Sequence, residues 1–309
     1  MSFEGNNVMV EEITYRGTDD EQREEIGTLF LVATPLGNRE DISPRAVKIL
    51  EQVDYVAAED TRTAAMLLSE LGIGNRLISY YEQNQRERHE TFLRDLLAGR
   101  SIAVISEAGM PCISDPGEGI VRLAVQHGIP ITVIPGPSAF VSAVAASGLD
   151  TRRFVYEGFI PARGSERRKL IEKIALERRT VVFYEAPHRI EKLFRDLLEA
   201  DLSERYVVVA RELTKRYEEF LRFTVAEAVA YYETVTPRGE FTIVLEGAEE
   251  YETRTGDTGV RSDDELVALL RTCLDKGMTT REAAAHVAAE TGDSKNKLYR
   301  LALSVKETH

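Results

Sequence analysis

The sequence predicts an α/β protein with two α/β domains and a small all-helical module near its C-terminus. Three observations carry this prediction. From residue 27 onward, short apolar runs rich in β-branched residues alternate with amphipathic stretches, as in sheets covered by helices. The share of strands rises after residue 148, and three helical stretches follow an acidic segment after residue 248. A chain of 309 residues is long enough for such domains.

The predicted boundaries divide the chain into five segments. Residues 1–26 are acidic and lack hydrophobic periodicity, so we expect a disordered extension. Residues 27–148 and 149–248 form the N-terminal and C-terminal α/β domains. Residues 249–261 are expected to be an acidic linker, and residues 262–309 a helical module that resembles a helix-turn-helix.

The elements follow from periodicity and from start and stop signals. In the first domain we expect strands at 28–34, 54–58, 101–106 and 131–134, and helices at 44–52, 62–71, 86–97, 117–127 and 138–146. Ser43 before Pro44 is typical of a helix start. The alternation of strands and helices predicts a largely parallel sheet.

The second domain and the module differ in pattern. The domain is expected to hold strands at 154–159, 180–184, 206–211, 220–223 and 241–245, and helices at 166–176, 189–200 and 225–232, which indicates a mixed sheet. The module is expected to hold helices at 263–276, 280–290 and 294–305. Thr279 with Glu282 three residues later predicts a capping box.

Charge and composition exclude several classes of protein. The net charge of −13 comes mainly from residues 1–26 and 246–265, which carry −6 each. The rest of the chain therefore sums to about −1. The overall acidity does not argue against a nucleic-acid partner for the folded parts. No uninterrupted apolar run reaches membrane-spanning length, and no secretory signal is present. We therefore expect a cytoplasmic protein. Cys112 and Cys273 build neither a disulfide framework nor a thiolate metal site, and no metal is expected.

Three strand ends carry unusual loops. Residues 33–38, 106–117 and 135–139 are rich in glycine and proline. One such loop alone is most often just a turn. Three of them at the carboxyl ends of strands favour a shared small-molecule site, because ligands bind at that edge of α/β sheets. Neither a G-x-G-x-x-G sequence nor a P-loop is present.

The loops belong to an ordered series of motifs. The series is Val32–Asn38, Asp41–Ala46, Ala57–Arg62, Ile113–Gly117, Ile134–Ala139, Glu157–Phe159, Phe183–Arg189, Ala210–Lys215 and Gly239–Phe241. It resembles the tetrapyrrole methylase superfamily, and more narrowly its branch that methylates small-subunit ribosomal RNA. The resemblance implies the two-domain class III methyltransferase fold, the cofactor S-adenosylmethionine (SAM) and a homodimer. It also implies 2′-O-methylation of a cytidine ribose in the decoding region of 16S rRNA, on naked rRNA or on the small ribosomal subunit.

The resemblance also implies a set of site residues. SAM would lie between the two domains, against Pro35, Glu107, Ala108, Gly109, Met110, Ile113, Ser138, Ala139, Tyr184, Glu240 and Phe241. The substrate candidates, chosen also for their polar or basic side chains, are Asn38, Arg39, Asp60, Arg62, Glu82, Asn84, His188, Arg189, Lys295, Lys297 and Arg300. No catalytic residue is assigned.

Each candidate has an alternative structural role. Tyr184 and Phe241 would also suit a core, Asp60 a helix cap, and His188 a local hydrogen bond. Arg39 and Arg62 are the best phosphate candidates, because a guanidinium pairs bidentately with phosphate. The basic stretches 162–179 and 294–306 would suit phosphate contacts or solvated helix faces.

Several residues depart from the family pattern. Tyr81 and Gln83 stand where the family usually has histidines, and Glu107, Met110 and Cys112 stand for Asp, Thr and Gly. A histidine base at positions 81 and 83 is therefore not available. Methyl transfer to a hydroxyl is an in-line displacement that depends mainly on alignment, so the activity is expected to survive.

Two other functions remain open. One is a methyltransferase of the same fold that acts on a precorrin or another tetrapyrrole. The other is a nucleic-acid-binding regulator whose helical tail is the working part, which would leave the three strand-end loops without a purpose.

Overall fold

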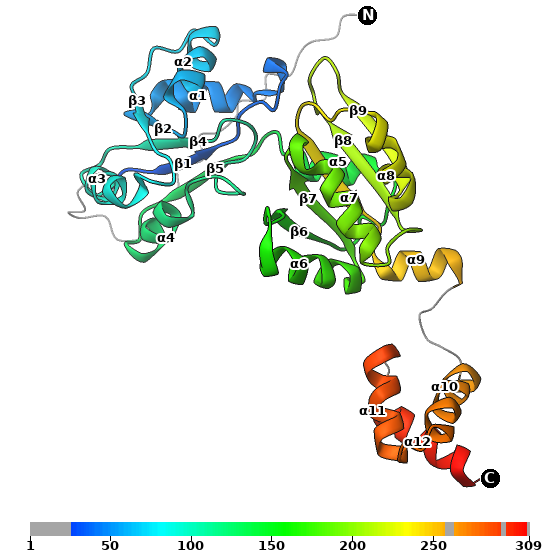
Figure 1. Ribbon diagram of the computed structural model, residues 1–309. Coiled ribbons are helices and arrows are strands. Elements are labelled where there is room, and N and C mark those ends of the chain that lie inside the picture. The colour runs from blue at the N-terminus through cyan, green and yellow to red at the C-terminus, as the bar shows by residue number, and fades with distance from the viewer. Residues whose placement is uncertain (1–25, 257–262, 292–294, 308–309) are drawn as a thin grey trace, which may run out of the picture. The chain divides into compact units, whose positions relative to one another are not determined.

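The computed structural model describes residues 26–256, 263–291 and 295–307 (Figure 1). The predicted extension, residues 1–26, lies outside this range except for its last residue. The chain divides into two compact units between Ser138 and Ala139. Within the described residues, no helix is both long enough and apolar enough to cross a membrane.

The first unit is built on a five-stranded sheet. Its elements are β1 (Leu29–Val32), η1 (Arg39–Asp41), α1 (Pro44–Gln52), β2 (Tyr55–Ala58), α2 (Thr61–Glu70), β3 (Leu77–Ser79), α3 (Gln85–Leu97), β4 (Ile102–Ile105), α4 (Glu118–Gln126) and β5 (Ile131–Ile134). The strands lie in the order β3-β2-β4-β1-β5, and every strand pair is parallel. The predicted parallel sheet is confirmed.

Helices cover both faces of this sheet. Leu50 of α1 and Leu68 of α2 pack on one face, and Phe92 of α3 and Ile120 of α4 on the other. Strands β1, β2 and β4 are buried on both sides almost throughout, which is why they are continuous apolar runs. As predicted, α1 begins at Ser43, whose hydroxyl accepts a hydrogen bond from the Ala46 N–H at 3.0 Å.

Strand β3 is missing from the sequence-based prediction. It has three residues, each half-buried, and lies at the edge of the sheet beside β2. A strand this short, with neither full burial nor clear alternation, leaves no periodic signal.

The second unit holds a mixed sheet. Its α/β elements are α5 (Ala139–Ser147), β6 (Phe154–Phe159), α6 (Gly164–Leu176), β7 (Thr180–Glu185), η2 (Pro187–Arg189), α7 (Ile190–Glu199), β8 (Tyr206–Arg211), β9 (Glu219–Thr224), α8 (Val225–Thr234), β10 (Phe241–Leu245) and α9 (Ala248–Thr255). The strand order is β6-β7-β10-β8-β9, with β6 and β7 parallel and the other pairs antiparallel. The predicted mixed sheet is confirmed.

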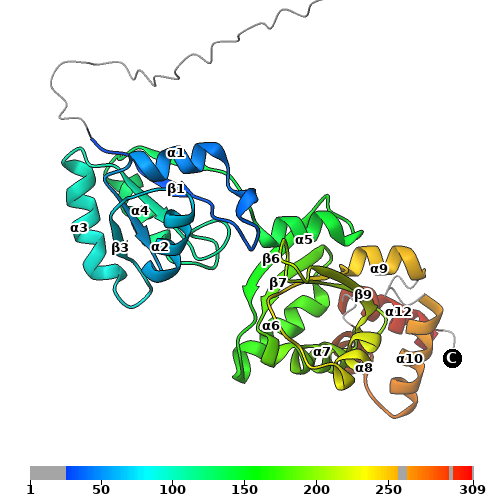
Figure 2. The ribbon, with the colours of Figure 1, turned by 90° about the horizontal axis from the view of Figure 1, so that it is seen from above.

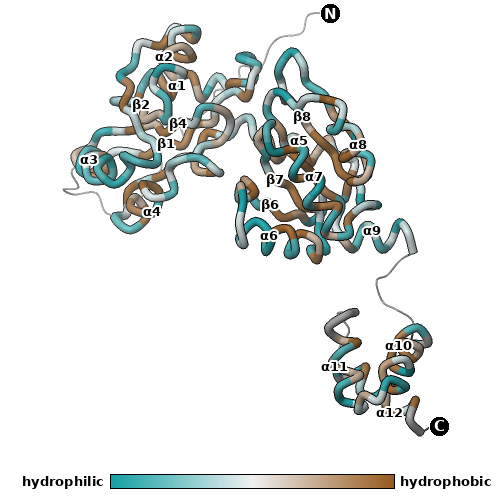
Figure 3. The backbone as a smooth tube through the Cα atoms, viewed as in Figure 1, coloured by the Kyte–Doolittle hydropathy of each residue, from teal (hydrophilic) through white to brown (hydrophobic). Residues whose placement is uncertain are grey.

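The two faces of the second sheet are covered unequally. Helices α6, α7 and α8 bury Phe183 and Phe194 in a large apolar cluster, where the rings of Phe194 and Tyr232 stack with centroids 5.5 Å apart. Helix α5 contacts β7, β8 and β10 on the other face. Figure 3 shows hydrophobic and hydrophilic turns alternating along α6 and α7, as expected for helices with one buried side.

The packing of α5 corrects the predicted division after residue 148. This helix follows the first sheet in the sequence but packs on the second, so the division between the units falls at Ser138 and Ala139. The sequence does not reveal this, because an apolar helix after a strand fits either sheet equally well.

The predicted linker 249–261 is largely helical, since α9 spans most of it. Its first turn is tied down by Ala248 N–H to Glu177 O at 2.9 Å and Glu249 N–H to Arg178 O at 3.1 Å. Arg254 forms an ion pair with the fully buried carboxylate of Glu246 at 2.8 Å. The acids of this segment therefore hold a helix against the sheet. Residues 257–262 lie outside the described range.

The C-terminal module consists of three helices, α10 (Asp263–Asp275), α11 (Thr280–Thr291) and α12 (Lys295–Glu307). They contact one another around Leu266, Leu270, Val287 and Leu298 (Figure 2). The predicted capping box is present, with hydrogen bonds in both directions between Thr279 and Glu282. The predicted turn between the last two helices, residues 292–294, lies outside the described residues.

Candidate functional site

The loops after β1 and β4 are joined by backbone hydrogen bonds. Thr34 and Gly109 exchange N–H···O bonds of 2.9 and 3.0 Å, which form an isolated antiparallel bridge. The Thr34 hydroxyl also donates to Ser106 O at 3.1 Å, and the Ser106 hydroxyl donates to Gly109 O at 3.1 Å. Because β1 and β4 are parallel neighbours, these bonds fix two of the three glycine- and proline-rich loops to each other.

Gly109 is the point at which the third loop joins them. Its φ of +86° favours glycine. A Cβ at this position would lie 3.1 Å from Leu36 Cδ2, so the Leu36 side chain would have to give way, and it would touch Pro137 O at 3.5 Å. At Gly136, a Cβ would lie 2.9 Å from the Ala33 Cβ. The predicted convergence of the three strand-end loops is thus confirmed within the first unit.

The loop after β4 is held in an unusual conformation. Cys112 and Ser114 have φ values of +71° and +63°, which are rare for residues with a side chain. Gly117, with φ +140°, lies so close to the Cys112 side chain that a Cβ would overlap the sulfur. Such strain tends to collect at ligand sites. The glycine that the family usually has at position 112 is consistent with this left-handed backbone.

Three carboxylates gather at the same edge of the sheet. Glu59 follows β2, Glu107 follows β4, and Asp115 lies in the strained loop. Burial together with the charges of Glu59 and Glu107 raises the pKa of Asp115 to about 7. Burial, then the charge of Glu107, also raises the pKa of Glu59. The site therefore has a negative, partly dry rim that favours a cationic ligand.

A small pocket opens between β2, β4 and α2 at this rim. Its lining includes Arg39, Glu59, Thr63, Ser106 and Glu107. Within the described part of the chain, no group of His, Cys, Asp and Glu side chains is arranged to hold a metal ion.

Glu59 and Asp115 are functional candidates that the sequence-based list omits. The signal for Glu59 was its position directly after a buried strand, at the same edge as Glu107. For Asp115 no such signal exists, because its burial depends on the path of a loop with left-handed residues.

The raised pKa of Asp115 makes a pH-dependent contribution to stability. The folded protein binds this proton more tightly than the unfolded chain, where the pKa is near 3.8. The contribution is therefore full below about pH 4 and is lost as the pH rises to about 7. We expect the wild type, relative to Asp115→Asn, to lose up to about 1.4 kcal/mol of unfolding free energy per pH unit in this interval.

Urea titrations of both proteins across this interval measure that difference. A constant difference between wild type and variant from pH 4 to pH 7 would show that Asp115 titrates normally.

The cofactor candidates of the first unit lie around the three-loop junction. Pro35 is buried behind Thr34, Ala108 is half-buried, and Met110 packs against the core beneath the loop. Glu107 and Ile113 are exposed. Ser138 and Ala139 are half-buried at the start of α5, where the chain passes between the units.

The candidates of the second unit gather at one edge of its sheet. Phe241 opens β10 and pairs with Glu185, next to Tyr184. Tyr184 is half-buried between the rings of Tyr156 and Phe159, with centroids 5.4 Å away in each case. Phe241 is only 3% exposed and belongs to the apolar cluster. The expected core role therefore applies to the Phe241 side chain, and its part in cofactor binding stays a prediction.

Glu240 takes part in a charged network at this edge. Lys215 lies 3.0 Å from the Glu240 carboxylate and 3.1 Å from that of Glu212. Glu212 also accepts the Glu240 N–H at 3.0 Å, and both Glu212 and Thr214 have positive φ. This network fixes the turn after β8 against the start of β10.

The substrate candidates of the first unit already have partners within the protein. Asn38 caps η1, and Arg39 pairs with Glu70 at 2.7 Å. Asp60 caps α2 and forms a two-point ion pair with Arg62, which holds the pKa of Asp60 at about 2. The expected cap at Asp60 is confirmed. Arg62 remains largely exposed and presents its guanidinium at the acidic rim.

The candidates of the 80–84 loop have different environments. The Asn84 side chain donates to Ser79 O at 3.1 Å and accepts the Tyr81 N–H at 2.9 Å, so it fixes the loop. Glu82 is exposed, and its charge contributes to the raised pKa of Glu59. Glu82 therefore lies near the rim, whereas Asn84 has a structural contact.

The Glu185–Arg189 motif holds a buried ion-pair network. The Glu185 side chain is fully buried and pairs with Arg167 at 3.3 Å and with Arg189 at 2.5 Å. Arg189 also donates to Ile160 O. His188, by contrast, is exposed on η2. Arg189 is thus placed in the network, and His188 is the member of this motif that solvent reaches.

The basic residues of α12 differ in their exposure. Lys297 pairs with Asp263 at 2.9 Å and is half-buried. Lys295 and Arg300 are exposed on α12, as is Tyr299. The basic face predicted for this helix is thus carried chiefly by Lys295 and Arg300.

Two family models match the chain. The model of the Tetrapyrrole (Corrin/Porphyrin) Methylases matches residues 28–229, and that of the RsmI C-terminal HTH domain matches residues 260–306. The first match covers every strand of the two sheets except β10, and the second covers nearly all of the three-helix module.

Curated relatives match over nearly the whole chain. A Synechocystis protein named ribosomal RNA small subunit methyltransferase I is 42% identical over 281 residues, which is 91% of this chain and 99% of the relative. The protein of that name from Halalkalibacterium halodurans is 41% identical over 286 residues, which is 91% of this chain and 96% of the relative.

Solved structures share the fold at low identity. A cobalt precorrin-4 methyltransferase is 19% identical with a TM-score of 0.53, covering 71% of this chain and 94% of that one. A uroporphyrin-III C-methyltransferase from Thermus thermophilus, complexed with S-adenosylhomocysteine, is 19% identical with a TM-score of 0.50, covering 71% and 97%. These structures support the fold, and the family matches go further: the chain belongs to the tetrapyrrole methylase family, and within it to the ribosomal RNA small subunit methyltransferase I proteins.

Proposed function

We propose that this chain transfers a methyl group from SAM to the 2′-hydroxyl of a cytidine ribose in the decoding region of 16S rRNA. The observation that carries the proposal is the junction of three strand-end loops at Gly109, beside a negative rim, in a chain 42% identical to a ribosomal RNA small subunit methyltransferase I. The relatives' names support rRNA as the substrate class. The ribose position rests on the resemblance described for the sequence.

The residues of the first unit fit SAM as the cofactor. When bound, SAM supplies an electrophilic methyl group on a positively charged sulfur. Gly109 provides a backbone surface without a side chain. Glu107 and Asp115 provide negative charge for the cationic sulfonium and amino groups. Pro35, Ala108 and Ile113 supply the remaining surface of the junction.

The proposed catalysis relies on positioning. Bringing a hydroxyl into line with the methyl group supplies on the order of 7–11 kcal/mol in favourable cases. Tyr81 and Gln83 supply no imidazole. Among the carboxylates of the rim, Asp115 has a pKa of about 7. A pKa this close to neutrality suits a proton acceptor.

Arg62 is the proposed contact for substrate phosphate in the first unit. Its guanidinium is held by Asp60 in a two-point pair that leaves the rest of the group exposed. An arginine held in this way loses less side-chain entropy when it binds phosphate.

Transfer of labelled methyl from SAM to alternative acceptors tests the proposal. The acceptors are small ribosomal subunits, deproteinised 16S rRNA and uroporphyrinogen III. We expect label in the RNA and none in the tetrapyrrole. Label in the tetrapyrrole alone would favour the other branch of the family, and label in neither, with RNA still bound, would favour a regulator.

The helical module and the homodimer are proposals of the same kind. If the basic face of α12 binds rRNA, deletion of residues 261–309 should leave SAM affinity unchanged and weaken RNA binding, and the loss should shrink as salt rises. Calorimetry with SAM, filter binding with rRNA and light scattering of both proteins measure these effects. If the truncated protein stays folded and dimeric and binds rRNA as before, the module has no part in RNA binding.

A further inference from the structure

An open hollow lies at the end of the second sheet where β6 and β7 begin. It is lined by Arg152, Arg153, Phe154 and Arg179, without a carboxylate among them, and we call it the arginine hollow. Phe154 and Thr180, the first residues of the two strands, are partners in the sheet. Tyr184 and Phe159 pair at the other end, roughly 17 Å along β6. The hollow is therefore distant from the predicted cofactor residues of this unit.

Two of the three arginines are held in place from outside the hollow. Asp150 binds Arg152 through Nε and NH2, at 3.0 and 2.8 Å, and Glu177 binds Arg179 through Nε and NH2, at 2.8 and 2.9 Å. In each guanidinium, NH1 is left outside this two-point pair. Arg153 is exposed and has no ion pair with any described residue.

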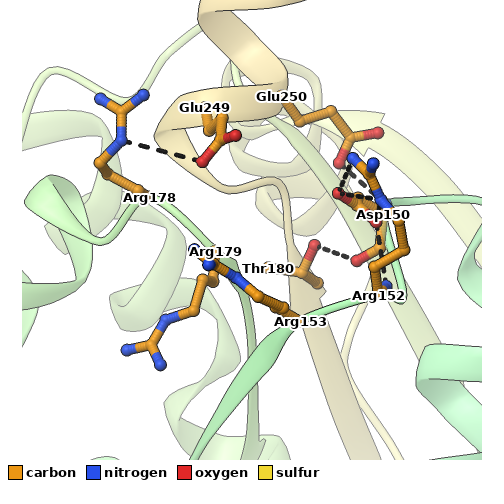
Figure 4. A pocket seen from close by; sticks show the side chains of 8 residues that line it. All are labelled: Asp150, Arg152, Arg153, Arg178, Arg179, Thr180, Glu249 and Glu250. Atoms are coloured by element: carbon orange, nitrogen blue, oxygen red, sulfur yellow. Dashed lines mark hydrogen bonds and ion pairs between the residues drawn. The ribbon is translucent and has the colours of Figure 1, made fainter.

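A second, mixed pocket continues from the hollow toward α9. Figure 4 shows Arg152 beside Asp150, and Arg178 turned toward Glu249. Arg178 also pairs with Glu252 in a fork of 3.1 and 3.2 Å. Glu249 and Glu252 of α9 thus face Arg178, whereas Glu250 accepts the Asp150 N–H at 2.9 Å on the Arg152 side. Among the described residues, Arg153 is the arginine of the hollow that keeps no ion pair.

An aromatic row leads away from the hollow along β6. Phe154 is 38% exposed, and its ring lies 6.4 Å from that of Phe140. Phe140 stacks on Tyr156 at 4.6 Å, Tyr156 contacts Tyr184 at 5.4 Å, and Tyr184 contacts Phe159 at 5.4 Å. Phe159 is 54% exposed at the far end. Both ends of the row therefore present a ring to solvent.

We propose that the arginine hollow binds a phosphate of single-stranded rRNA, with the neighbouring base stacked on Phe154. Oriented guanidinium groups beside an exposed ring are the combination that proteins use for single-stranded nucleic acid. The row along β6 then leads the strand toward the edge that carries Tyr184. This inference rests on the proposed rRNA substrate and names a second contact region for it, distinct from Arg62 and from the module.

Four sets of variants test the hollow, and all the changed side chains are exposed. Arg153→Ala/Arg179→Ala removes phosphate contacts, and Phe154→Ala removes the stacking surface. Arg122→Ala/Arg195→Ala is the matched control, since these arginines are also exposed and each pairs with a glutamate of its own helix. Phe154→Trp is the conservative replacement. The probe is a fluorescein-labelled single-stranded RNA with the decoding-region sequence, and anisotropy gives its affinity at several salt concentrations.

The double variant should bind the probe at least about tenfold more weakly, and the slope of log K against log salt should fall by about 1.4, for two contacts of about 0.7 each. Phe154→Ala should bind at least about fivefold more weakly with the slope unchanged. Phe154→Trp and the control should bind as the wild type does. Equal affinity of the double variant and the control would overturn the proposal. The proposal would also be overturned if inorganic phosphate or cytidine monophosphate displaced the probe at the same concentrations as unlabelled RNA. The hollow would then be a site for free anions.

The design separates this proposal from the proposed function. RNA binding is measured without SAM, and methyl transfer to small ribosomal subunits is measured separately. If the wild type methylates the subunits and the double variant does so with unchanged KM, the hollow has no role while the function stands. If the wild type transfers no methyl group but the double variant binds RNA more weakly than the wild type does, the proposed function fails and the RNA-binding role of the hollow stands.

Discussion

Gly109→Val is expected to abolish SAM binding, with a loss of at least about 100-fold in affinity, or about 2.7 kcal/mol. Two effects combine. A β-branched residue is strained at a φ of +86°. Its Cβ would also lie 3.1 Å from Leu36 Cδ2 and 3.5 Å from the Pro137 carbonyl, so the Leu36 side chain would have to move at the junction. Isothermal calorimetry with SAM measures the loss.

Gly72→Val separates the two effects. Gly72 also has a positive φ, of +72°, but nothing lies within 4 Å of a Cβ at this position. The control therefore carries similar backbone strain in the same unit without disturbing the loops. We expect it to lose some stability and to keep its SAM affinity. If both variants lost affinity equally, general strain would explain the result, and unchanged affinity in Gly109→Val would remove SAM from this junction.

Glu185→Ala is expected to lower the free energy of unfolding by about 3–5 kcal/mol. The change leaves two guanidinium groups without their shared carboxylate, in a place where the Arg167 side chain is 3% exposed and that of Arg189 is 19% exposed. Arg167 keeps its pair with Asp196, whereas Arg189 loses the carboxylate with which it pairs. Because the chain has no tryptophan, far-ultraviolet circular dichroism in urea is the suitable measurement.

Glu191→Ala is the control for this prediction. Its pair with Arg195 lies on the surface of α7, with both side chains about half exposed. Such pairs contribute roughly 0–1 kcal/mol. A loss in Glu185→Ala no larger than in Glu191→Ala would show that the buried network does not stabilise the second unit.

The fold was predictable where the pattern is local. Buried strands such as β2 and β4 are short apolar runs, and helices such as α1 carry their own start signals, so their bounds agree with the prediction within a few residues. Packing was not predictable in the same way. The apolar helix α5 gives no sign that it covers the second sheet, and the acidic sequence of α9 suggests a linker. Its acids are used in ion pairs with arginines distant in sequence, such as Arg178.

The candidate site was predictable to the level of loops. Glycine and proline after three strands indicate a shared edge, and the junction of Thr34 with Gly109 agrees with this. The carboxylate rim and the arginine hollow were not predictable, because each brings together residues from separate segments. Arg152 and Arg179, for example, belong to different strand starts that only the parallel pairing of β6 and β7 brings together.

The most direct test is mass spectrometry of 16S rRNA nucleosides after reaction of small ribosomal subunits with the protein and SAM carrying a trideuterated methyl group. The expected product is a single labelled 2′-O-methylcytidine, located in a nuclease fragment from the decoding region and absent with Gly109→Val. A label on a base, a label outside the decoding region, or unlabelled rRNA in the presence of folded, SAM-binding protein would contradict the proposed function.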